Sequence, residues 1–123
     1  MSPRLVAFIS GGIWKTRPID EQPEMQLARW SVWEVGSGSS ATCHFVGYNL
    51  IDHEGRASSA IVDFDSVALR GRTKSGRIYE LIGPPGHDGD GDYVFARWLE
   101  LNGKPEHREI TSEIVPLMSE AQQ

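Results

Sequence analysis

The stretch from Val67 to Asn102 constrains the fold most, because turn signals divide it into apolar runs. Thr73–Gly76 separates two of these runs and ends in glycine, which is typical of a β-hairpin. Pro84-Pro85-Gly86 ends the second run, because proline lacks the N–H that a strand ladder needs and Pro-Gly favours a turn. An Asp/Gly loop and a third run follow. The stretch therefore predicts a three-strand antiparallel unit, with strands at Val67–Arg72, Arg77–Gly83 and Asp92–Asn102.

The rest of the chain repeats this pattern of apolar runs separated by polar turns. Met25–Val35 carries large apolar residues on both alternating faces, which indicates a strand covered on both sides or a strand with a bulge. Gly47 in the middle of another run also indicates a bend or a bulge. The expected strands outside the central stretch are Leu5–Ile9, Met25–Val35, Thr42–Ile51 and Ala57–Asp65.

Together these runs predict a single domain, residues 1–123, that is mainly β. Glycines inside the strands favour curvature, so we expect one antiparallel sheet of six to seven strands, either barrel-like or strongly bent. The C-terminal segment has two interpretations. Ile110, Ile114, Leu117 and Met118 fall at helical spacing and predict a short C-terminal helix, whereas alternation from Ile110 onward would suit a strand.

The charge and the cysteine content exclude several classes of protein. A formal net charge of −5 repels phosphate backbones, which argues against nucleic acid as a partner. Cys43 stands alone, so an intramolecular disulfide framework is excluded. Leu5–Ile9 is too short for the core of a signal peptide, and no apolar run approaches the roughly 18 residues of a transmembrane helix. We therefore expect a cytoplasmic protein with no membrane partner.

The Asp/Gly loop Gly86–Asp92 resembles the start of a calcium-binding EF-hand loop, with acids at alternate positions. The similarity then fails, because Tyr93 stands where that loop needs glycine and Leu99 stands where it needs a bidentate glutamate. The interpretation that remains is a polar, solvated turn. We accordingly expect no bound metal and no cofactor.

One candidate for catalysis is a pair of carboxylates, Asp63 and Asp65, which would point the same way on a strand. Asp63 could act together with His44 or His53 as acid and base in a small hydrolase-like enzyme, but no spacing in the sequence requires this pairing. Cys43 and His44 are neighbours and would face opposite sides of a strand, so Cys43 is expected to be a small buried residue.

A second candidate is the basic hairpin around Arg70, Arg72 and Arg77, with Tyr79 on its second strand. Basic residues beside an aromatic ring are typical of sites for anionic ligands or single-stranded nucleic acid. The competing interpretation is a solvated edge whose charges discourage aggregation. Because the chain carries a net negative charge, we rank nucleic-acid binding below the other candidate functions.

The function that we expect first is a non-enzymatic binding module for a small organic ligand or a partner protein. Aromatic side chains would line the concave face of the sheet, and Arg97 would orient a ligand by its charge. Long strands rich in aromatic residues also make a homodimer plausible. The expected ligand-binding residues are Trp30, Tyr48, Tyr79, Arg97 and Trp98.

Two segments, Ser75–Gly83 and Tyr93–Trp98, resemble small uncharacterised bacterial proteins, some of which are carried on mobile, integron-type gene cassettes. The resemblance covers about a third of the chain. It implies an accessory bacterial protein located in the cytoplasm, and it transfers no functional residues.

Overall fold

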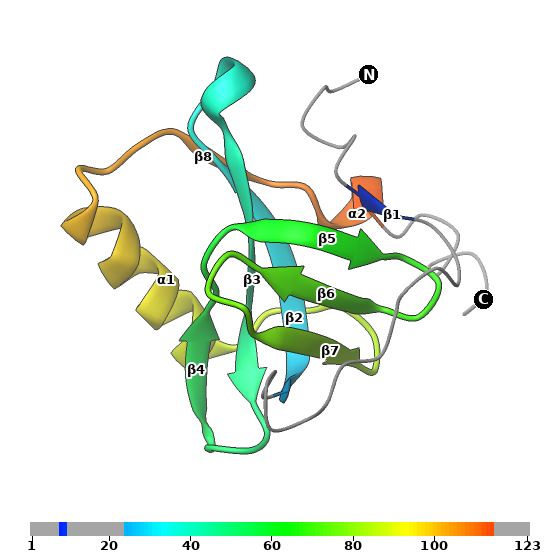
Figure 1. The fold of residues 1–123 in the computed structure, drawn as a ribbon. Coiled ribbons are helices and arrows are strands. Elements are labelled where there is room, and N and C mark those ends of the chain that lie inside the picture. Colours follow the sequence, from blue (N-terminus) through cyan, green and yellow to red (C-terminus); the bar gives the residue numbers. More distant parts are fainter. Residues whose placement is uncertain (1–7, 10–23, 115–123) are drawn as a thin grey trace.

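The computed structural model describes residues 8–9 and 24–114, and within them the fold is mainly β (Figure 1). One mixed sheet runs in the order β1-β5-β6-β7-β2-β3-β4, with β8 paired to β2 off this path. The strands are β1 (Phe8–Ile9), β2 (Glu24–Val35), β3 (Thr42–Asn49), β4 (Glu54–Ala57), β5 (Ile61–Asp65), β6 (Arg70–Thr73), β7 (Ile78–Ile82) and β8 (His107–Glu109). The short helical elements are the 3-10 turn η2 (Gly38–Ser40) and α2 (Thr111–Ile114), and the long helix is α1 (Gly89–Leu101).

Strand β2 organises the sheet because it has three partners. It pairs antiparallel with β3 along one edge, while its first half pairs parallel with β7 and its last three residues pair antiparallel with β8. The register shifts between Ala28 and Ser31, where Arg29 has a φ of 48°. The bulge, one of the two interpretations of this strand, is therefore present. The expectation of a purely antiparallel sheet is wrong, because β2–β7 and β1–β5 are parallel pairs.

The sheet bends strongly and does not close into a barrel. The ring of Phe45 on β3 lies 5.7 Å from that of Phe64 on β5 and 5.5 Å from that of Tyr79 on β7, measured between centroids. These strands are not neighbours in the sheet, so their contact requires the sheet to fold back on itself. Gly71 on β6 permits this, because a Cβ there would lie 2.6 Å from the Phe45 ring. The main core fills the resulting concave face.

Helix α1 replaces the third strand expected at Asp92–Asn102, and that prediction is wrong. Phe95 and Leu99 are four residues apart, so they share one helix face and bury it against Val35 and Val46 on the convex side of the sheet. Asp88 is the N-cap, and its side chain accepts a hydrogen bond from the Gly91 N–H at 2.9 Å. Figure 1 shows the helix alongside β3 and β4, outside the bent sheet.

The supposed calcium-like loop is thus the beginning of a helix. Asp90 and Asp92 lie in the first turn, where negative charge is favourable. Burial opposes ionisation of Asp88, but hydrogen bonds from Gly91 and Arg29 and the charge of Arg29 outweigh it and lower the pKa of Asp88. Glycine also lets the helix approach the sheet, since a Cβ on Gly91 would lie 2.6 Å from the Gly47 carbonyl oxygen.

The remaining sequence predictions agree in part with the structure. Of the return strand expected at Ala57–Asp65, Ile61–Asp65 forms β5 and Ala57 is the last residue of β4, and the strand expected to begin at Val67 begins at Arg70. Only Phe8–Ile9 of the N-terminal strand is described, and it forms β1. A short C-terminal helix is present as α2, while Leu117 and Met118 lie outside the described residues. Among the described segments, no helix is long and apolar enough to span a membrane.

Candidate functional site

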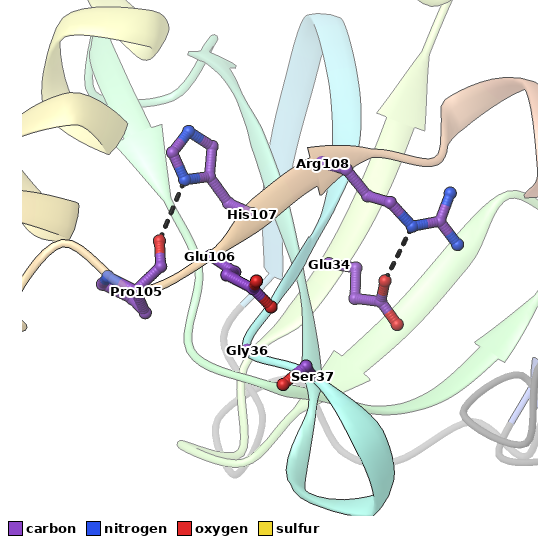
Figure 2. A pocket seen from close by; sticks show the side chains of 7 residues that line it. All are labelled: Glu34, Gly36, Ser37, Pro105, Glu106, His107 and Arg108. Atoms are coloured by element: carbon purple, nitrogen blue, oxygen red, sulfur yellow. Dashed lines mark hydrogen bonds and ion pairs between the residues drawn. The ribbon is translucent and has the colours of Figure 1, made fainter.

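A pocket with a cavity volume of about 570 Å³ lies where the end of β2 meets β8. Its walls come from the end of β2, the residues just beyond it, the chain that leads into β8, and β8 itself. Figure 2 shows these side chains around the opening, with Glu34 and Arg108 pointing toward each other. The lining residues are Glu34, Gly36, Ser37, Pro105, Glu106, His107 and Arg108.

The register of the β2–β8 pair decides which side chains reach the pocket. Glu34 lies opposite Arg108, and the Gly36 N–H donates to the Glu106 carbonyl at 2.7 Å. Side chains on paired residues share a face, so Glu34, Glu106 and Arg108 lie together on the concave side. His107 faces the other side, where its ring lies 5.9 Å from Trp33 and 6.1 Å from Phe95.

The carboxylate of Glu34 is the deepest charge of the pocket. Its side chain is only 5% exposed, and Oε1 accepts a hydrogen bond from Arg108 Nε at 2.9 Å. Arg108 also donates through Nη1 to Glu113 Oε2 at 2.6 Å. The hydrogen bond to Glu113 is the main reason why the pKa of Arg108 is raised, so its guanidinium stays charged.

The charge balance around the pocket is negative. Of three nearby carboxylates, those of Glu34 and Glu106 line the pocket together with Arg108, whereas Glu113 lies outside the lining and pairs with the same guanidinium. Two of them already share Arg108, whereas Glu106 is exposed and makes no side-chain ion pair with the described residues. The chemistry offered to a ligand is therefore an anionic wall beside the Ser37 hydroxyl and peptide groups.

A histidine bridge braces β8 from the convex side. The ring of His87 reaches Glu109 Oε1 on β8 through Nε2 at 3.0 Å and Asp92 Oδ2 on α1 through Nδ1 at 3.3 Å. A neutral imidazole carries one N–H, so only the protonated ring donates to both carboxylates. Burial opposes protonation, but the charges and hydrogen bonds of Glu109 and Asp92 outweigh it and raise the pKa of His87.

This bridge predicts a pH dependence of stability. A group whose pKa is higher in the folded state stabilises the fold below its unfolded pKa, and that stabilisation is lost as pH rises through the folded pKa. We expect His87→Gln to reduce the free energy of unfolding more at about pH 5.5 than at about pH 8.5. Denaturant titrations of both proteins at the two pH values measure the difference. His53→Gln, at an exposed turn, is the control, and an equal loss at both pH values contradicts the bridge.

The structure does not gather the five expected ligand-binding residues on an open concave face. Trp30 and Tyr79 are 0% and 1% exposed and belong to the core. Tyr48 is half-buried beneath the Arg29 guanidinium, 5.0 Å from its ring centroid, and Trp98 lies 4.9 Å from the His44 ring. The expectation that Arg97 points into the concave face is wrong, because it lies on the exposed side of α1 and pairs with Glu100.

The carboxylate and histidines of the enzyme hypothesis have other partners. Asp63 forms an ion pair with Arg72 across β5 and β6. His44 donates from Nδ1 to the Ser58 carbonyl at 2.8 Å, and its Nε2 lies 2.7 Å from the Thr42 hydroxyl, which can donate to it when the ring is neutral. Burial lowers the pKa of His44, which opposes its protonation. His53 lies at the exposed turn between β3 and β4.

The basic hairpin is largely neutralised by neighbouring acids. Arg70 forms an ion pair with Glu24 and Arg72 with Asp63, so two of its three arginines hold partners within the sheet. The Tyr79 hydroxyl accepts a hydrogen bond from Arg56 at 3.3 Å, and its ring is in the core. The competing interpretation of a solvated edge is wrong, because β6 and β7 lie inside the sheet, between β5 and β2. Within the described ranges, no group of three or more His, Cys, Asp or Glu residues is placed to hold a metal ion.

Sequence reasoning missed the pocket, although one signal was present. Trp30, Val32 and Glu34 alternate on the face that forms the core, and a glutamate continuing such an apolar face marks the place where the core gives way to a polar opening. Its partner Arg108 is 74 residues away, and no local pattern predicts that pairing.

Comparisons of the chain with protein-family models, with curated proteins and with solved structures found no match. The resemblance to small bacterial gene-cassette proteins therefore stays a prediction.

Proposed function

We propose that the protein is a non-enzymatic binding module whose site is the pocket between the end of β2 and β8. The ligand is an organic cation, either a small molecule or a basic side chain on a partner protein. The observation that carries the proposal is the excess of carboxylates around the opening, with Glu106 exposed and unshared. An ammonium or guanidinium group gains charge-assisted hydrogen bonds from such an environment.

The position of the pocket also supports binding. It opens at the end of the bent sheet, where main-chain pairing of β2 with β8 anchors the two short connecting segments that complete its walls. Arg108 is held between Glu34 and Glu113, so it positions the buried carboxylate of Glu34. The exposed carboxylate of Glu106 is left for the ligand. The proposed site is therefore narrower than the concave binding face expected from the sequence, because it occupies only the polar end of that face.

The proposal is tested by calorimetric titration of the full chain with Nα-acetyl-arginine amide. Glu106→Gln removes the exposed charge while retaining the shape of the side chain, so we expect binding to weaken about threefold to fivefold. Glu100→Gln is the matched control, since it removes an exposed acid on α1 that pairs with Arg97. Binding should also weaken as salt is raised.

Nα-acetyl-glutamate amide provides the comparison of ligand charge. We expect no measurable binding of this anion under conditions where the arginine derivative binds. Equal affinity for the two compounds, or equal weakening by Glu106→Gln and Glu100→Gln, contradicts the proposed site.

A further inference from the structure

Strand β8 is an edge strand of the sheet. Its residues His107 to Glu109 are all exposed, and β2 is its partner among the described strands. The Glu106 carbonyl and the Ile110 N–H both bond toward β2, to Gly36 and Val32. Because main-chain groups alternate in direction along an antiparallel strand, the N–H and C=O groups of His107 and Glu109 point to the outer edge.

The outer edge of β8 and the pocket form one continuous surface. Glu106 and Arg108 line the pocket, and they alternate with His107 and Glu109, whose main-chain groups face outward. β8 contains no proline, and its pairing with β2 has no register shift, so neither of these common obstacles to strand addition is present. An added strand would therefore place every second side chain beside the pocket.

We infer that the partner supplies an extended basic segment that pairs with β8 as an additional strand and places a Lys or Arg side chain beside Glu106. This rests on the proposed function of the pocket. Main-chain hydrogen bonds would give such a complex affinity, and the pocket would select the side chain.

Charge complementarity favours a basic segment over a second copy of the chain. Glu34 and Glu106 line the pocket beside β8 and Glu113 pairs with Arg108, while Glu109 and Asp92 lie on the other side with His87 between them. Cationic side chains on either face of an added strand would therefore lie beside acidic side chains of the protein. Two β8 strands paired about a two-fold axis at Arg108 would instead oppose the two guanidinium groups, and like charges directly opposite destabilise a pair.

The inference is tested with an acetylated, amidated peptide of sequence Lys-Val-Lys-Val-Lys, titrated into the full chain by calorimetry. A second version carries a methyl group on every peptide nitrogen, which keeps the three charges and removes the N–H groups. We expect the methylated peptide to bind at least about tenfold more weakly. A Glu-Val-Glu-Val-Glu peptide should not bind.

A matched pair of variants tests the same edge from the protein's side. His107→Pro removes an outward N–H, whereas His107→Ala removes only the ring, and proline is tolerated on the outer side of an edge strand. We expect peptide affinity to fall about tenfold for His107→Pro relative to His107→Ala, with thermal melting confirming that both variants are folded.

Equal binding of both basic peptides overturns strand addition and leaves the cation pocket standing. The same conclusion follows if Nα-acetyl-arginine amide binds but the peptides bind no better. Failure of every cationic probe overturns the proposed function as well. A dimer in sedimentation experiments that is lost in His107→Pro but kept in His107→Ala would make a second copy the occupant and overturn the basic segment.

Discussion

Gly55→Ala is expected to destabilise the protein by about 3 kcal/mol, because the new methyl group would collide with the backbone of α1. A Cβ on Gly55 would lie 2.2 Å from the Asp90 carbonyl oxygen and 2.6 Å from the Gly91 nitrogen. Neither atom can move unless the start of the helix moves away from β4. Denaturant unfolding followed by circular dichroism measures the loss.

Gly89→Ala is the matched control in the same region. Gly89 is the first residue of α1, and a Cβ there meets no atom within 4 Å. Alanine is the better helix former, so this variant should be unchanged or more stable by about 0.5 kcal/mol. If Gly55→Ala is tolerated as well as Gly89→Ala, α1 does not pack against β4 as described.

Trp30→Ala is expected to have the larger effect, a loss of about 3 to 5 kcal/mol in the free energy of unfolding. The Trp30 side chain is fully buried in the main core, and its Nε1–H donates to the Gly83 carbonyl at 3.1 Å. Removing the ring leaves a cavity and an acceptor without its donor. Such a loss is comparable to the whole stability of many domains, so the variant should unfold at much lower denaturant concentration.

The same substitution at Tyr93 provides the comparison. Tyr93 is 66% exposed on α1, so Tyr93→Ala should change the free energy of unfolding by less than about 0.5 kcal/mol. If Trp30 instead lined an open ligand-binding face, its replacement would cost little more than that of Tyr93. A small effect of Trp30→Ala would thus contradict its position in the core.

Much of the sheet could be predicted from local patterns. Turns rich in glycine and proline mark the ends of the strands. The two-sided apolar pattern of Met25–Val35 indicates either a bulge or layers on each face, and β2 has both. The direction of pairing could not be predicted in this way. Parallel pairing of β2 with β7 joins Glu24 to Ile78 across a long stretch of chain, and local turn signals carry no information about such contacts.

Helix α1 shows why the central stretch was misinterpreted. Tyr93, Val94, Phe95 and Trp98 are residues that favour strands, and their alternation concealed the four-residue spacing of Phe95 and Leu99. The cap signal was available, because an aspartate followed by acids in the next turn is typical of a helix start. Packing on the convex face then overrides the strand preference of these residues.

The candidate site was the least predictable part. Arg97 alternates with apolar residues, which would place it on an apolar face in a strand, but in helix α1 it lies on the exposed side and pairs with Glu100. The pocket instead depends on Glu34 and Arg108, which come together only through the pairing of β2 with β8. A binding surface on a bent sheet therefore stays a prediction, but the residues proposed for it are now those of the pocket.

The cation pocket is tested most directly by a nuclear magnetic resonance titration of the nitrogen-15-labelled full chain with Nα-acetyl-arginine amide. We expect saturable amide shifts at Gly36, Ser37 and Glu106, which are among the residues that line the opening. Those shifts should become smaller in Glu106→Gln at the same ligand concentration. Shifts confined to the β6–β7 hairpin or to the exposed face of α1, or no shifts at about 10 mM ligand, would contradict the proposed cation pocket.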